Sequence, residues 1–90
     1  MDTLRTVLEE LRDEGFTWVR TDQDQTVDDF LDQLADEGPE MTYDTHEDGT
    51  ARLFHVTEEG TREEEVYAIL FTEAAHKEDV KKGNGGYEAA

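Results

Sequence analysis

The chain has 90 residues, a formal net charge of −17 and no cysteine. One domain with a small core is expected at this length, because such a chain buries only about 60 to 65% of the surface its unfolded form exposes. The lack of cysteine excludes disulfides, thiolate nucleophiles, iron–sulfur clusters and cysteine zinc sites. No stretch approaches the roughly 18 consecutive apolar residues of a transmembrane helix, so we expect a cytoplasmic protein without membrane contact.

Acidic residues are scattered along the whole chain and number 25, whereas the three lysines, Lys77, Lys81 and Lys82, lie near its end. This composition resembles that of proteins from salt-accumulating halophilic archaea (haloarchaea). The resemblance implies a cytoplasm with molar salt and names no activity. The Debye length at molar ionic strength is only about 3 Å, so we expect salt to stabilise the fold by screening the repulsion among carboxylates.

The first predicted element is an amphipathic helix over residues 2–14. Its apolar residues recur at i, i+3, i+4 and i+7, namely Leu4, Val7, Leu8 and Leu11. We expect Asp2 or Thr3 to start this helix and Gly15 to end it. Residues 16–21 (FTWVRT) then predict a short strand, because they are rich in β-branched and aromatic residues.

A second amphipathic helix is predicted to start at Thr26 and to end before Gly38-Pro39. Thr26 and Asp29 have the spacing of a capping box with Asp in place of Glu. The apolar stripe of this helix is Val27, Phe30, Leu31 and Leu34.

From Glu40 onward the apolar period changes to two, and residues 41–46, 51–58 and 64–72 predict a three-stranded antiparallel meander. A two-residue turn at Asp48-Gly49 predicts Tyr43 opposite Phe54, and a tight turn at Gly60-Thr61 predicts Phe54 opposite Tyr67. These registers gather one aromatic face: Met41, Tyr43, Phe54, Val56, Tyr67, Ile69 and Phe71. We expect the two helices to pack on this face.

The opposite face of the meander keeps an apolar patch, which we predict as a dimer face: Leu53, His55, Val66, Ala68 and Leu70. Segment 64–72 (EEVYAILFT) is apolar without alternation, so something is expected to cover this patch as well. The candidates are a second copy of the chain and segment 73–82, which can form a short helix with few apolar residues. We favour the homodimer.

The predicted fold class is therefore α+β, in the order α-β-α-β-β-β with room for a short C-terminal helix. Two amphipathic helices pack on one face of a small, mainly antiparallel sheet. Residues 1–82 are expected to form this single domain and residues 83–90 a flexible tail.

Candidate chemical groups are few. Asp44, His46 and His55 share one predicted sheet face, but no HxH, HExxH or HxxxH spacing occurs, so ordinary surface histidines are favoured over a metal or catalytic site. Trp18 and Arg20 share one side of the first strand with Phe16 and can stack a base or hold an anion, although a core role for Phe16 and Trp18 is favoured. No catalytic residue, metal or cofactor is predicted.

The sequence favours a non-enzymatic protein-association module that acts as a homodimer, with an unidentified protein partner as a further option. The alternative is a small-ligand-binding or regulatory module whose pocket, between sheet and helices, is lined by Trp18, Tyr43 and Tyr67. The order of elements also resembles winged-helix DNA-binding domains. Their DNA-reading helix would correspond to residues 26–37, which contain no Arg or Lys, so nucleic-acid binding is disfavoured.

Overall fold

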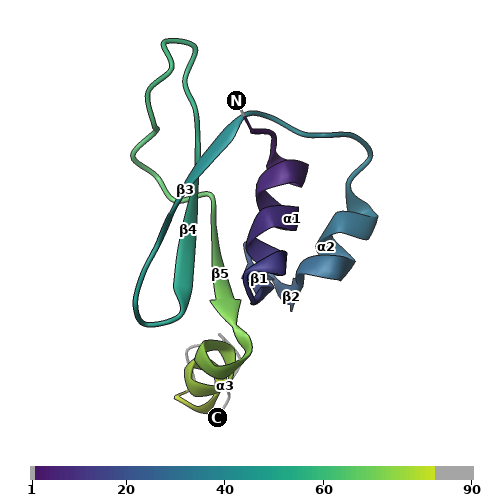
Figure 1. Cartoon of the computed structure of the whole chain (residues 1–90), viewed down its shortest axis with the longest axis vertical. Helices are drawn as coiled ribbons and strands as arrows, with labels where there is room; N and C mark the ends of the chain where they lie inside the picture. Colours follow the sequence, from purple (N-terminus) through teal and green to yellow (C-terminus); the bar gives the residue numbers. More distant parts are fainter. Residues whose placement is uncertain (1, 83–90) are drawn as a thin grey trace.

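A computed structural model describes residues 2–82, so the predicted tail lies outside the described residues. The elements follow the order α1 (Leu4–Asp13), β1 (Phe16–Arg20), β2 (Asp24–Thr26), α2 (Val27–Gln33), β3 (Met41–Thr45), β4 (Thr50–His55), β5 (Ala68–Thr72) and α3 (Glu73–Lys81) (Figure 1). The predicted α+β class is confirmed. The strands form one antiparallel sheet in the order β2-β1-β5-β4-β3.

Helices α1 and α2 begin where the sequence predicts. The Thr3 side chain accepts a hydrogen bond from the Thr6 N–H, and the Thr26 side chain accepts one from the Asp29 N–H. Both threonines thus satisfy backbone donors that a helix start leaves unpaired. The helices contribute their predicted apolar stripes to the core except for Leu34, which follows the end of α2 and is half-buried against that core.

The predicted register of the β3–β4 hairpin is wrong by one residue. Tyr43 pairs with Leu53 instead of Phe54. The loop has three residues instead of two: the His46 N–H donates to the Thr50 carbonyl, and Gly49 adopts a φ of +87°. A shift of one residue moves a strand's side chains to the opposite face, so Met41 and Tyr43 lie on the Leu53 side of the sheet.

The helices consequently pack on the sheet face opposite to the predicted one. Leu53, Ala68 and Leu70 are 0%, 2% and 0% exposed and belong to the core beneath α1 and α2. Of the five residues assigned to a dimer face, Val66 is 42% exposed, and His55 is half-buried with its ring centroid 5.0 Å from that of Tyr67 in an edge-to-face arrangement. The expected open patch is therefore covered within one chain, so the predicted homodimer would need another surface.

Strand β5 explains the unbroken apolar run near residue 70. It lies between β1 and β4, in the centre of the sheet. Ala68 and Leu70 face α1 and α2, whereas Phe71 lies on the other face, where α3 packs. A strand covered on both faces needs no alternation of polar and apolar residues.

Strand β1 contains an irregularity that the sequence did not predict. Its pairing with β5 shifts register between Phe16 and Trp18. Phe16 lies in the core, but Trp18 lies on the opposite face against α3, so the expectation that both share one side is wrong. Strand β2 was also not predicted, because its three residues, DQT, carry no apolar pattern.

Candidate functional site

Helix α3 covers the sheet face opposite to α1 and α2. It follows β5 without an intervening residue, and the Thr72 side chain caps it by accepting a hydrogen bond from the Ala75 N–H. None of its side chains is fully buried. Its attachment therefore depends on a set of polar and aromatic contacts, which we call the Arg20–His76 cluster: Trp18, Arg20, Asp24, His76 and Asp79.

The imidazole of His76 lies at the centre of this cluster. Its ring stacks on Trp18 with ring centroids 3.9 Å apart and planes inclined by 5°, and Phe71 lies edge-on at 6.0 Å. His76 Nε2 lies 2.7 Å from Asp24 Oδ2, and these two side chains are only 12% and 9% exposed. The Trp18 indole N–H also donates to Glu73 at the start of α3, at 3.3 Å.

Arg20 forms the second half of the cluster. A terminal guanidinium nitrogen lies 2.6 Å from Asp79 Oδ2, and Nε lies 3.6 Å from Asp24 Oδ1. The guanidinium carbon is 4.7 Å from the centroid of the Phe71 ring. Burial acts to lower the pKa of Arg20, but Asp79 and Asp24 outweigh it and raise the pKa above its ordinary value. The cluster thus joins β1, β2 and α3 through paired charges.

The imidazole of His76 is engaged by its neighbours on one ring face and at one ring nitrogen. A histidine beside an aspartate is the base and orienting group of many acid–base sites. Here, however, one ring face is covered by Trp18 and Nε2 is directed at Asp24. No group of three or more His, Asp or Glu side chains able to hold a metal ion occurs among residues 2–82.

The predicted ligand pocket does not form. Trp18 contacts α3, whereas Tyr43 and Tyr67 pack against the core on the other side of the sheet. The predicted grouping of Asp44 with His55 also fails. Asp44 pairs with Arg62, whose guanidinium lies over the Phe54 ring, and the shifted register places His55 on the opposite face.

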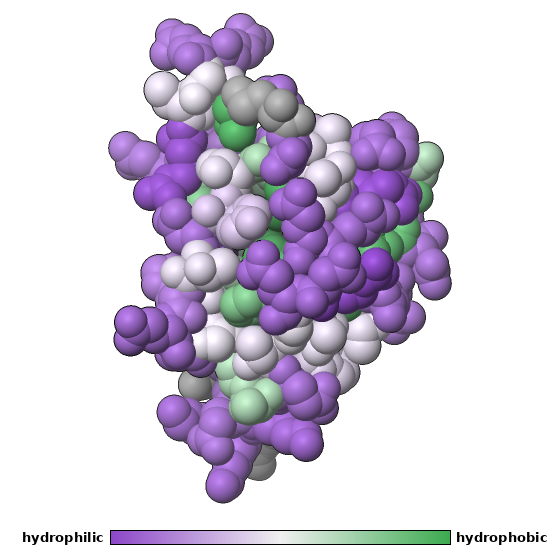
Figure 2. Space-filling view, in the orientation of Figure 1, coloured by the Kyte–Doolittle hydropathy of each residue, from purple (hydrophilic) through white to green (hydrophobic). Residues whose placement is uncertain are grey.

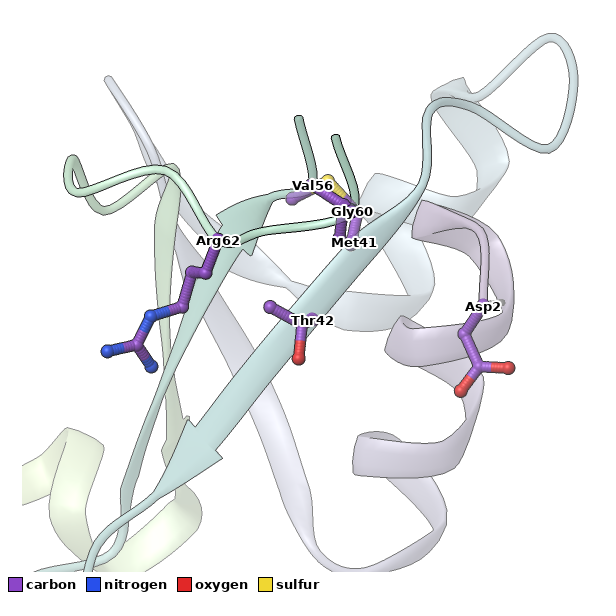
Figure 3. Close-up of a pocket in the computed structure, with 6 residues that line it drawn as sticks. All are labelled: Asp2, Met41, Thr42, Val56, Gly60 and Arg62. Atoms are coloured by element: carbon purple, nitrogen blue, oxygen red, sulfur yellow. The ribbon is translucent and has the colours of Figure 1, made fainter. Parts of the chain in front are cut away.

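The surface of the described residues is hollowed in places. One hollow, of about 500 Å³, is lined by Asp2, Met41, Thr42, Val56, Gly60 and Arg62 (Figure 3). Asp2 and Arg62 lie on opposite sides of β3 in this view, so their charges do not converge on one point. Another, of about 380 Å³, lies between the β3–β4 turn and α3 and is lined by Asp48, Thr50, Phe71, Ala74, Ala75, Glu78, Asp79 and Lys82.

The outer edge of β3 offers backbone groups for pairing. Toward β4, the Glu40 carbonyl accepts from the Val56 N–H and the His46 N–H donates to the Thr50 carbonyl. Even-numbered residues of β3 therefore bond to β4, and the backbone groups of Tyr43 and Thr45 point away from it. We call these groups the free edge of β3.

Only the beginning of this outer edge is covered by another described segment. Asp2 accepts a hydrogen bond from the Met41 N–H, and Thr3 forms an isolated bridge with Glu40. No other bond to the outer edge of β3 occurs within residues 2–82. The free edge, at Tyr43 and Thr45, is thus one part of the sheet at which backbone N–H and C=O groups are available to pair with a further strand, and β2 lies at the opposite edge of the sheet.

The surroundings of Tyr43 are acidic. Burial, followed by the carboxylates of Glu14, Glu10 and Asp2, raises the pKa of the Tyr43 phenol. These three acidic residues are exposed. Within residues 2–82, no basic side chain lies within ion-pair distance of any of their carboxylates.

Comparisons with known proteins found no relative from which a function could be transferred. No family model matches the sequence. A curated protein or a solved structure that matches it was likewise not found. None of the described helices is both long and apolar enough to cross a bilayer.

The Arg20–His76 cluster was not predicted from the sequence, although Trp18 and Arg20 were expected on one side of β1. A further signal was present in segment 73–82, where His76 and Asp79 are three residues apart and so share one helix face. The free edge of β3 was also not predicted, because the meander placed residues 41–46 at one margin but did not show whether the strand over residues 16–21 would pair there or beside residues 64–72.

Proposed function

We propose that this chain is a non-enzymatic protein-association module, which binds an extended segment of another polypeptide as an added strand at the free edge of β3. The observation that carries this proposal is the outward orientation of the Tyr43 and Thr45 backbone groups, with no described element bonded to them. Strand addition to an exposed sheet edge is a recurrent mode of peptide recognition, in which main-chain hydrogen bonds provide affinity.

A salt-rich setting favours this mode over association through charge. The composition supports a cytoplasmic protein of a halophilic cell, where long-range attraction between charged surfaces is screened. Hydrogen bonds between backbone amides do not depend on net charge. Each contributes only about 0.5 to 1.5 kcal/mol net, so we expect a weak and reversible complex.

The large hydrophobic surfaces typical of stable dimers are not part of this proposal. Among the described residues, the large apolar side chains that are exposed are Val66 and Val80, at 42% and 43%. The face shown in Figure 2 is mainly hydrophilic, with hydrophobic residues in small separate areas. This supports a contact made by strand pairing instead of by apolar burial.

A second copy of the chain is a poorer partner for this edge than a different polypeptide. Antiparallel pairing centred on Asp44 would set two Asp44 carboxylates directly opposite each other, which is unfavourable. Pairing centred on Tyr43 would bring Thr45 of the second copy beside Met41, whose N–H already bonds to Asp2.

We therefore expect light scattering to show a monomer in about 2 M KCl, where surface charge is screened.

The experiment for strand addition uses peptides selected from a random display library against the chain in about 2 M KCl. Binding is followed by backbone amide chemical shifts. We expect the largest changes at Tyr43 and Thr45. Thr45→Pro removes the outward N–H without touching the bonds to β4, so it should weaken binding at least tenfold, whereas Thr45→Val should not. Selected peptides that shift other regions and bind Thr45→Pro normally would exclude the free edge as the contact.

A further inference from the structure

The free edge of β3 has chemically different surroundings on its two sides. Tyr43 is half-buried on the side of α1 and α2 and packs against the core. Asp44 lies on the other side, where Arg62 already pairs with it. An added strand places alternate side chains on these two sides, so each side can select a different kind of residue.

We infer that the strand bound at β3 carries an arginine or lysine opposite Tyr43, where Glu10 and Glu14 at the end of α1 receive its charge. This inference rests on the strand addition proposed above and names the chemistry of the partner. Directly opposed residues on neighbouring strands have Cβ atoms about 4.5 to 5.5 Å apart on the same face. A side chain opposite Tyr43 therefore points to the side on which α1 lies.

Three features of α1 favour a cation at this position. Helix α1 contacts β3, and Glu10 and Glu14 lie on the flank of α1 opposite to Arg12, which pairs with Asp28 of α2. The carboxylates of Glu10, Glu14 and Asp2 also raise the pKa of the Tyr43 phenol, and no described basic side chain lies within ion-pair distance of them. Glu10 and Glu14 are four residues apart, a spacing at which like charges repel each other along a helix. Glu14 also caps the C-terminal end of α1, where the helix dipole favours positive charge.

The same arrangement disfavours other occupants of the edge. A second copy of this chain would bring its own Tyr43 and acidic residues to the edge. It would therefore add negative charge beside Glu10 and Glu14. A guanidinium fits better than an ammonium group, because it can bind a carboxylate with two hydrogen bonds and stack on the Tyr43 ring. Molar salt also screens long-range attraction between charges more strongly than it screens an ion pair in direct contact.

The probe is a seven-residue peptide of alternating Thr and Val with Arg, Gln or Glu at the central position. Dissociation constants are measured by amide shift titration in about 2 M KCl. We expect the Arg peptide to bind two- to fivefold more tightly than the Gln peptide, which is the effect of an exposed ion pair. The Glu peptide should bind most weakly. All binding peptides should shift Tyr43 and Thr45.

Variants of α1 assign the effect to the named carboxylates. The Glu10→Gln/Glu14→Gln variant should bind the Arg and Gln peptides equally well. The matched control is Glu9→Gln, an exposed residue of the same helix that does not affect the Tyr43 pKa, and it should keep the preference for Arg.

The outcomes separate this inference from the proposed function. Equal binding of all three peptides, with shifts at Tyr43 and Thr45, would overturn the basic partner and leave strand addition intact. An Arg preference that survives the double Gln variant would likewise overturn the role of Glu10 and Glu14. The absence of any shift at β3 with every peptide would overturn strand addition itself, and the inference with it.

Discussion

The two faces of the sheet are covered by helices in different ways. Beneath α1 and α2, the contact is made by fully buried apolar side chains such as Leu8, Leu53 and Leu70. Beneath α3, the helix buries none of its side chains fully, and the contact is made by a stacked imidazole and paired charges around Arg20. Burial of apolar surface is non-directional, whereas stacking and charge pairing require particular atoms at particular distances.

The two faces therefore differ in what they contribute: one stabilises the fold as a whole, and the other holds α3 in position. Apolar burial on the α1 and α2 side supplies most of the favourable free energy of folding, because each large core side chain contributes about 1.5 to 3 kcal/mol. A charge pair that loses water contributes much less net, although removal of one partner is costly. We therefore expect α3 to be held in place specifically but to contribute little to global stability.

The largest expected effect is the loss of the fold in Leu53→Asp. Leu53 is fully buried, so the substitution places an unpaired carboxylate in the core at a cost of more than about 4 kcal/mol. Val66→Asp is the matched control, because Val66 is 42% exposed, and it should remain folded. Circular dichroism in about 2 M KCl distinguishes the two. A folded Leu53→Asp variant would mean that Leu53 lies on an open face after all.

A smaller, local effect is expected for His76→Ala. The substitution removes the stack on Trp18 and the bond to Asp24, at a cost of about 1 to 2 kcal/mol. Trp18 is the single tryptophan of the chain, so its fluorescence reports directly on the cluster. The emission should shift to longer wavelength as water reaches the indole.

The control for that variant is Lys81→Ala, which changes an exposed residue of α3. No described acidic side chain lies within ion-pair distance of Lys81, so its loss should change stability by less than about 1 kcal/mol and leave the emission unchanged. A His76→Ala variant as unstable as a core truncation would remove the distinction between the two faces.

The smallest expected effect concerns the pH response of the β3–β4 turn, next to α3. Hydrogen bonds from the Thr50 hydroxyl and N–H, at 2.6 and 3.1 Å, lower the pKa of Asp48 below its ordinary 3.8. The ionised carboxylate therefore supports the turn above the ordinary pKa, and this support is lost as pH falls through the lower, folded value. Thr50→Val should raise the Asp48 pKa in an NMR titration, whereas Thr45→Val should not.

The elements that the sequence predicted have either a strong apolar period or a composition typical of strands. Helices α1 and α2 and strands β3 and β4 follow from apolar spacing, whereas β1 and β5 follow from runs rich in apolar, β-branched and aromatic residues. The register of β3 did not follow, because Asp48-Gly49 is compatible with both a two-residue and a three-residue loop. That one-residue difference decided which face the helices cover.

The candidate sites were harder to predict than the fold for a physical reason. His76 meets Asp24 across 52 positions of the sequence, and Trp18 meets Glu73 across 55. No local pattern encodes such contacts, since they depend on the sheet order and on the irregularity in β1. The free edge of β3 likewise follows only from the order of the strands.

The central position of β5 also sets the order in which the chain can fold. The strands that precede it form two hairpins, β1 with β2 and β3 with β4, and these hairpins do not pair with each other. The sheet is completed only when residues 68–72 enter between β1 and β4. Until that last strand has been made, the two hairpins can be linked only through α1 and its N-terminal residues, which contact β3. Such late, non-local closure predicts slow folding, with both inner strand edges open to wrong partners until β5 arrives.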